Sequence, residues 1–150
     1  MAIETTFIMV KPDGVQRGLV GKIVARFEAK GFRLMGMKMM KISQEMAQTH
    51  YGEHQGKPFF QELVDFITAS PVVAMAWEGD QAIDLCRTLM GATRAEEAAP
   101  GTIRGDFAQY TGKNLVHGSD STESARRELE IFFQPEDLIS YKLDGTHWVL

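Results

Sequence analysis

Several features common in other protein classes are scarce or missing in these 150 residues. There is one cysteine, Cys86, so an intrachain disulfide is excluded and we expect a cytoplasmic protein in a reducing compartment. No apolar run approaches the roughly 20 residues that cross a bilayer. The first residues also lack the basic flank and apolar core of a secretory signal, so we expect no membrane partner.

An excess of basic charge is also missing. Sixteen basic and twenty acidic residues give a net charge of −4. A mildly acidic chain is not built to coat nucleic acid or an anionic membrane, so we expect no requirement for nucleic acid. An anionic ligand would need a local cluster of basic side chains.

No internal repeat, low-complexity tract or linker divides the chain, and we expect a single domain over residues 1–150. Residue patterns predict strands at 5–10, 32–42, 72–77 and 115–116. They predict helices at 20–27, 43–51, 60–67, 80–89 and 120–133. This order favours an α/β or α+β domain with helices packed on a sheet, while the order of the strands stays open.

Turn and cap residues refine these limits. Residues 11–14 (Lys-Pro-Asp-Gly) predict a turn. Ser43 and Asp80 are candidate helix caps, and Asp120 with Glu123 is a candidate capping pair. Residues 92–113 show little periodicity. Such a long stretch inside a domain is usually functional or disordered.

His117 stands where a short strand passes into a helix, followed by Gly118. Gly118 permits close approach of a ligand, and free N–H groups at a helix start favour an anion. A neutral imidazole is nucleophilic and can attack phosphorus. A lone histidine at a strand end is nevertheless more often structural than catalytic.

The position of Glu128 on its predicted helix makes a catalytic role for His117 more plausible. The apolar face of the last helix consists of Ala125, Leu129, Phe132 and Phe133. Glu128 projects at the edge of that face rather than toward the polar side. A carboxylate there needs a partner, and His117 at the start of the same helix is a candidate. The alternative is a glutamate whose stem reaches water.

Four segments resemble the nucleoside diphosphate kinase family. Residues 114–121 (Asn-Leu-Val-His-Gly-Ser-Asp-Ser) resemble its active-site signature. The other three matching segments, in the family's order, are residues 7–14, 56–60 and 100–106. A lone His-Gly-Ser would be weak, but several motifs in the same order are specific.

The resemblance implies an α+β, ferredoxin-like fold with a four-stranded antiparallel sheet covered by helices. It implies a ping-pong reaction in which a nucleoside triphosphate phosphorylates the histidine and a nucleoside diphosphate takes the group away. It also implies Mg²⁺ on the phosphates and attack through Nδ1. A covalent relay of this kind splits one transfer into two steps.

Residue roles are carried over by the resemblance one position at a time. His117 matches the phosphorylated histidine and Glu128 the carboxylate that orients it, while Ser119 and Tyr51 match groups around the imidazole. The positions that match phosphate-binding residues are Arg87, Thr93, Arg104 and His54. The positions that match ribose, phosphate and base contacts are Lys11, Asn114 and Phe59. Stacking on an aromatic ring tolerates any base, so we expect broad base specificity.

Each of these residues also has a structural interpretation. Arg87 can complement a helix dipole, and Phe59 can belong to the core. Tyr51 and His54 can be a surface pair, and Lys11 can be a solvated strand end. Their joint occurrence in the family's order favours function.

The resemblance also implies a homo-oligomer, with conflicting cues about its size. Many family members carry Asn-Pro after the residue that Thr93 matches, whereas residues 93–97 here read Thr-Arg-Ala-Glu-Glu. The missing proline argues against a hexamer. The length of the tail at 142–150, with apolar Trp148 and Val149, argues for one, and a hexamer is slightly favoured over a tetramer.

Two rival functions follow from the same residues. One is a non-catalytic interaction protein that binds nucleotides or nucleic acid, against which the intact histidine, glutamate and arginine set counts. The other is a phosphohistidine carrier that receives its phosphoryl from a protein. In a carrier, Lys11, Phe59 and Asn114 would have no ribose or base to bind.

Overall fold

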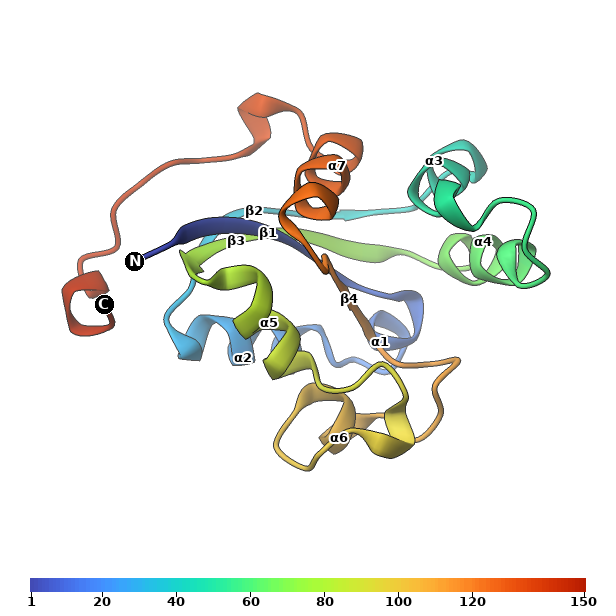
Figure 1. Cartoon of the computed structure of the whole chain (residues 1–150), viewed down its shortest axis with the longest axis horizontal. Coiled ribbons are helices and arrows are strands. Elements are labelled where there is room, and N and C mark those ends of the chain that lie inside the picture. Colours follow the sequence, from blue (N-terminus) through green and yellow to red (C-terminus); the bar gives the residue numbers. More distant parts are fainter.

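The computed structural model describes residues 1–150 and contains one antiparallel sheet in the order β2-β3-β1-β4 (Figure 1). The strands are β1 (Ile3–Val10), β2 (Arg33–Met40), β3 (Val72–Asp80) and β4 (Val116–Gly118). β1 is central and pairs with β3 along its full length and with β4 at its end. The expected α+β, ferredoxin-like fold with four antiparallel strands is confirmed.

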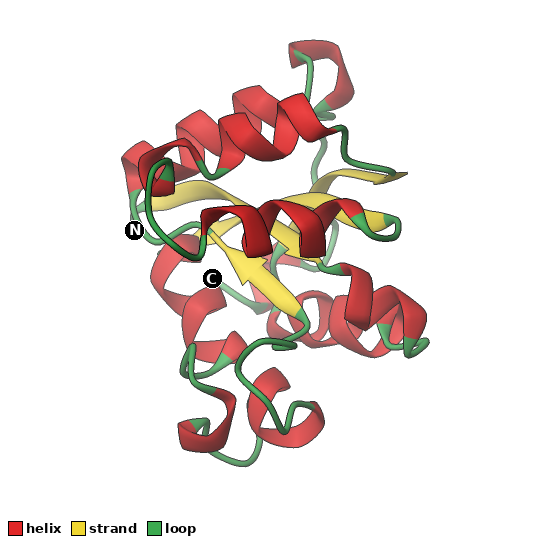
Figure 2. Ribbon diagram, turned by 90° about the vertical axis from the view of Figure 1, so that its right-hand side faces the viewer, coloured by secondary structure: helices red, strands yellow, loops and turns green.

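Helices cover both faces of this sheet (Figures 1 and 2). The α-helices are α1 (Pro12–Gln16), α2 (Val20–Lys30), α3 (Gln44–His50), α4 (Phe60–Thr68), α5 (Ala82–Met90), α6 (Ile103–Phe107) and α7 (Thr122–Phe132). Short 3₁₀ turns are η1 (Gly52–His54), η2 (Ala95–Glu97), η3 (Pro135–Asp137) and η4 (Thr146–Trp148). Helices α3, α4 and α7 lie on one face, and α2 and α5 on the other.

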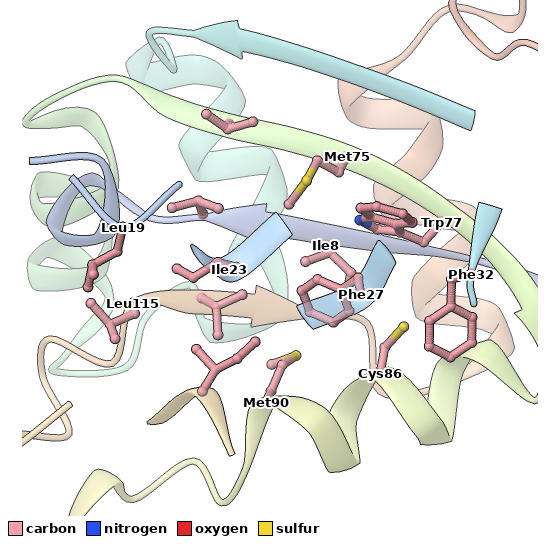
Figure 3. Packing of buried hydrophobic residues seen from close by; sticks show 14 of the residues in the cluster. Ile8, Leu19, Ile23, Phe27, Phe32, Met75, Trp77, Cys86, Met90 and Leu115 are labelled. Atoms are coloured by element: carbon pink, nitrogen blue, oxygen red, sulfur yellow. The ribbon is translucent and has the colours of Figure 1, made fainter. Parts of the chain in front are cut away.

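Alternation along β1 separates two cores. Phe7 and Met9 are buried in the cluster under α3, α4 and α7, whereas Ile8 and Val10 are buried in the cluster under α2 and α5. Figure 3 shows the second cluster, where Trp77 of β3 lies among side chains from both helices. Because successive strand residues point to opposite faces, one strand supplies both cores.

The predicted helix caps have mixed outcomes. Ser43 caps α3 as predicted, because its hydroxyl accepts a backbone N–H of the first turn. The prediction for Asp80 is wrong, since this residue ends β3 and its carboxylate accepts the N–H of Ala2 at 2.8 Å. The start of α5 is served instead by Glu4, whose carboxylate accepts the N–H of Ile83 at 3.2 Å. A neighbouring strand thus replaces the local cap.

The predicted capping pair of α7 is also wrong. Helix α7 begins at Thr122, and its cap is Ser121, whose hydroxyl accepts the N–H of Ser124 at 3.1 Å. Ser121 has an extended backbone, which a residue flanking a helix start requires. Asp120 is therefore outside the helix, exposed at the edge of a pocket.

Two segments expected to be irregular contain short helices. Pro12 opens α1 where a turn was predicted, because proline suits the first helical position. The 92–113 stretch contains η2 and α6, and Thr102 caps α6 by accepting the N–H of Gly105 at 2.9 Å. A side chain at Gly105 would clash with the carbonyl of Ala99, 1.8 Å from its Cβ position. Five-residue helices are too short to show a 3.6-residue period.

The last residues leave α7 and run toward the N-terminus (Figure 1). Val149 packs on Gly31, where a Cβ would lie 2.5 Å from a Val149 methyl group. Gly31 also has a φ of 105°, which favours glycine. Trp148, next to this contact, is 85% exposed. None of the helices has the length and apolar character needed to cross a membrane.

Candidate active site

His117 lies on the edge strand β4, and Leu115, the residue before this strand, determines how the strand begins. The Cα of His117 pairs with that of Met9, so its ring points to the face covered by α3 and α7. Leu115 before the strand has a φ of 74°, a conformation costly for a residue with a side chain. Its N–H donates to Asp13 at 2.9 Å, and its carbonyl accepts the N–H of Lys11 at 2.8 Å. These bonds hold the strained turn that presents His117.

Glu128 of α7 is the partner of His117. Its Oε2 lies 2.8 Å from Nε2 of His117, and its Oε1 accepts the hydroxyl of Ser119. The Glu128 side chain is 4% exposed, which excludes a stem that reaches water, whereas the His117 side chain is 25% exposed. The helical phase that placed Glu128 at the edge of the core is confirmed.

Electrostatics assign the proton in this pair. Burial alone would raise the pKa of Glu128, but the hydrogen bonds from His117 and Ser119 outweigh burial and hold that pKa below its usual range. An ionised carboxylate accepts hydrogen bonds, so Nε2 of His117 carries the proton. With the proton on Nε2, the free lone pair of an imidazole is on Nδ1.

His50, at the end of α3, joins His117 and Glu128 in one cluster, and the sequence did not indicate it. Its ring centroid lies 4.9 Å from that of His117, and its Nδ1 lies 3.5 Å from Oε2 of Glu128. The ring is buried against Phe132, and neither ring nitrogen has a hydrogen-bond partner. Burial first, and then the neighbouring His117, lower the pKa of His50 to about 3, so its ring is neutral.

A pocket of about 360 Å³ opens in front of this cluster. It is lined by His117 and Glu128 together with eight more of the expected residues, namely Lys11, Tyr51, His54, Phe59, Arg87, Thr93, Arg104 and Asn114. Ser119 is the expected residue that does not line it, because it lies buried behind Glu128. The structure therefore brings together residues from six separate segments.

Lys11 and Asn114 form a polar pair on one wall. The ammonium group of Lys11 donates to the side-chain carbonyl of Asn114 at 2.9 Å, and Asn114 donates to the backbone of Thr93 at 3.3 Å. Burial, and then the charge of Arg104, lower the pKa of Lys11 to about 8. Lys11 is thus a desolvated cation facing the pocket rather than a solvated strand end.

Two arginines supply further positive charge. Arg104 is 4% exposed and donates to the carbonyls of Gly91, Asn114 and Val116 at 3.0, 3.2 and 2.6 Å. Burial and the charge of Arg87 lower its pKa to about 10, which leaves it cationic at neutral pH. Arg87 donates one bond, to the carbonyl of Gly118 at 3.0 Å. Each guanidinium has five N–H donors, so both retain donors for a ligand.

Aromatic residues also line the pocket. Phe59 is 43% exposed and is therefore not a core residue, and its ring lies 5.4 Å from that of His54. Tyr51 is buried, which excludes a surface pair with His54. Burial, and then the nearby Glu128, raise the pKa of Tyr51 to about 12, so its hydroxyl keeps its proton. A flat exposed ring beside a cationic wall suits a base joined to phosphates.

Comparisons with known proteins agree with this geometry. The family model described as nucleoside diphosphate kinase matches residues 4–138. The chain belongs to the nucleoside diphosphate kinase family. Curated nucleoside diphosphate kinases of Carboxydothermus hydrogenoformans and Bacillus cereus are each 58% identical over 147 residues, covering 98% of this chain and 99% of theirs. Membership confirms the expected reaction, transfer of the γ-phosphoryl group of a nucleoside triphosphate to a nucleoside diphosphate through a phosphohistidine.

Solved structures give the same result. A halophilic nucleoside diphosphate kinase from Halobacterium salinarum in complex with CDP has a TM-score of 0.96 at 53% identity, covering 98% of both chains. A family protein from Babesia bovis has a TM-score of 0.96 at 48% identity, covering 98% of this chain and 99% of its own. Enzymes of this family need a divalent metal ion.

Some residues of the pocket were missed at the sequence level. They are His50, Glu53, Leu63, Met90, Asp120, Ser124 and Arg127. Arg127 of α7 reaches toward the carbonyls of Thr49 at 3.3 Å and His50 at 3.5 Å. A His-Tyr pair at the end of a predicted helix was the one available signal for His50.

Proposed function

We propose that Nδ1 of His117 is the atom that attacks the γ-phosphorus of a nucleoside triphosphate. The observation that carries this proposal is the bond between Nε2 of His117 and Glu128, which leaves Nδ1 as the free nitrogen in the pocket. The bond from Nδ1 to phosphorus forms as the bond to the leaving diphosphate oxygen breaks. A second nucleoside diphosphate then enters, and its terminal oxygen takes the group by the reverse step.

Glu128 and Ser119 act in this scheme by holding the ring. The carboxylate fixes the tautomer and stabilises the positive charge that develops on the imidazole during attack. Ser119 keeps the carboxylate in place through Oε1. Tyr51, protonated and buried beside Glu128, limits access of water to the same group.

The remaining lining residues are proposed to bind the nucleotide. Arg87, Arg104, Thr93 and His54 supply donors for the phosphate oxygens, and planar guanidinium groups can bind two oxygens at once. Lys11 and Asn114 reach the ribose hydroxyls and phosphates, and the base stacks on Phe59. This stacking supports broad base specificity, because every base has a π face.

Mg²⁺ is the proposed metal. Lys11, Arg87 and Arg104 make the lining cationic, so the ion would be held chiefly by phosphate oxygens. Exposed Asp120 and Glu53 are carboxylates at the rim that can accept hydrogen bonds from its water ligands. When bound, Mg²⁺ neutralises charge on the phosphates.

We also propose a homo-oligomer in the cytoplasm, built from this one domain of residues 1–150, with a hexamer favoured over a tetramer. Exposed Met37 and Met39 on the edge strand β2, and exposed Trp148 in the tail, are apolar surface that suits subunit contacts. The loop without proline is held by the ion pair of Arg94 with Glu96, and Glu96 also accepts the hydroxyl of Thr111 at 2.7 Å. Light scattering coupled to size-exclusion chromatography distinguishes six subunits from four.

A labelling experiment tests the reaction on this chain. Brief incubation with γ-labelled ATP should give an acid-labile, base-stable label on the protein that moves to GDP on addition. His117→Ala should abolish the label while nucleotide binding stays measurable, and His147→Ala, at an exposed histidine of the tail, should behave as the parent protein. Label that stays on the protein would indicate a carrier, and absence of label would overturn the proposal.

A further inference from the structure

His50 is a buried histidine without a hydrogen-bond partner, and the proposed phosphoryl transfer gives it no role. Its side chain is 2% exposed, and neither ring nitrogen has a hydrogen-bond partner. A buried polar group without a partner is costly, and a packed aromatic ring would fill the same space without that cost. The Nδ1 of His50 lies 3.5 Å from Oε2 of Glu128, and the ring centroids of His50 and His117 are 4.9 Å apart.

The three side chains have the spacing of metal ligands. One ligand atom from each of His50, His117 and Glu128 lies within 4.8 Å of the other two. Two ligands at about 2.1 Å from one tetrahedral Zn²⁺ are themselves about 3.4 Å apart. The Nδ1 of His50 lies 3.5 Å from Oε2 of Glu128, and the Nε2 of His117 lies 2.8 Å from it. The two distances to Oε2 therefore need to change by about 0.1 Å and about 0.6 Å to match a tetrahedral site. The ligand atoms of the two imidazoles lie within 4.8 Å of each other and can approach by rotation of the rings.

We propose that, in the absence of nucleotide, His50, His117 and Glu128 bind a transition-metal ion of the Zn²⁺ class and that this ion blocks phosphorylation of His117. The ion occupies the place of the proton between His117 and Glu128. Two imidazoles and one carboxylate are ligands that Zn²⁺ accepts in three-ligand sites, and a water from the pocket supplies the fourth. Mg²⁺ prefers oxygen ligands and does not compete for this site.

Inhibition follows from the tautomer of His117. The metal bond forms with the lone pair of Nε2, so the proton leaves Nε2, and a proton is taken up at Nδ1 to keep the ring neutral. No net proton is released, and the charge of the site rises by the charge of the ion. The lone pair of Nδ1 is then occupied, and attack on phosphorus stops. This consequence rests on the proposed role of Nδ1, whereas binding of the ion does not.

Binding is tested on the complete chain without nucleotide or affinity tag. Equilibrium dialysis with Zn²⁺ should find one ion per chain, and Co²⁺ should give the intense visible absorption of a tetrahedral site. His50→Gln should weaken binding by at least about tenfold, since loss of even a supporting group costs about that much. His50→Phe, which keeps an aromatic ring in the core, should do the same and guards against a folding defect. Cys86→Ser should bind as the parent chain does.

Inhibition is tested by labelling with γ-labelled ATP after incubation with Zn²⁺, each variant being compared with its own metal-free rate. The parent chain should lose labelling and regain it with a chelator, and both His50 variants should resist inhibition at least about tenfold better. His54→Gln, at another histidine of the pocket, should stay as sensitive as the parent chain. No bound ion, or equal binding by the His50 variants, would overturn the metal site. Absence of labelling without metal would instead overturn the proposed function.

Discussion

Glu128 and His117 are joined by a hydrogen bond of 2.8 Å between a helix and an edge strand. The carboxylate comes from the buried side of α7, and the imidazole from the middle of β4. Between them the chain turns at Ser119, whose hydroxyl binds the second carboxylate oxygen. A short segment thus contains the nucleophile His117, the carboxylate of Glu128 that orients it, and Ser119, which orients the carboxylate.

Removal of the orienting carboxylate should slow the chemistry without preventing it. In Glu128→Ala we expect phosphorylation of His117 to fall about 10- to 100-fold, because the ring loses its fixed tautomer and its stabilising charge. Single-turnover labelling measures this step directly, and nucleotide affinity should change little. Glu130→Gln, on the exposed side of the same helix, is the matched control. An unchanged labelling rate in Glu128→Ala would reject the orienting role.

Loss of the exposed ring should weaken binding of every nucleotide alike. Phe59→Ala is expected to raise the Kd of ADP and CDP by about 5- to 150-fold, corresponding to about 1–3 kcal/mol of stacking. Phe59→Tyr keeps the ring and should bind normally. Isothermal titration provides the affinities. A loss confined to one base, or a fall in thermal stability that accounts for it, would contradict the stacking role.

Nucleotide affinity should fall as the pH rises through about 8. The pKa of Lys11 is lowered from 10.5 to about 8, so Lys11 is charged at pH 7 and loses its charge above pH 8. The attraction to phosphate is therefore present below that value and lost above it. Titration of ADP between pH 6.5 and about 9.5 measures the effect. Lys11→Arg stays charged and should flatten the profile, and an equally steep profile in that variant would assign the titration to another group.

Arg104 should stabilise the fold in addition to binding the phosphates of the nucleotide. Its guanidinium binds three backbone carbonyls, and lysine cannot reach all three. We expect Arg104→Lys to lower the free energy of unfolding by at least about 2 kcal/mol and the Tm by about 4–8 °C. Thermal unfolding followed by circular dichroism measures this. Arg87→Lys, which gives up one such bond, should cost less, and equal losses would argue against the structural role.

The fold could be predicted where residues repeat a period over many positions. β1 and helices such as α2 and α4 were indicated by their apolar spacing, and the structure has them within a few residues of the predicted limits. Helix α6 was missed because five residues contain little more than one turn. The caps of α5 and α7 were wrong because Glu4 of another strand and Ser121 one residue later make the bonds.

The site could be predicted where the chain itself carries the signal. The histidine motif and the helical phase of Glu128 lie eleven residues apart, so local geometry was enough to pair them. His50 could not be placed, because its ring meets that of His117 on β4 only through tertiary packing, which no local sequence pattern reports. A buried imidazole and a surface imidazole look the same in a sequence.

By itself, the sequence determined which atoms can react, because side-chain chemistry and short-range periodicity are written along the chain. It specified a nucleophile, a carboxylate on the buried side of its helix and a set of cations. Only the tertiary structure decided that Nδ1 is the free nitrogen, that Lys11 is desolvated and that His50 joins the pair. The physical reason is that hydrogen-bond partners and burial depend on residues distant in sequence, which only packing brings together.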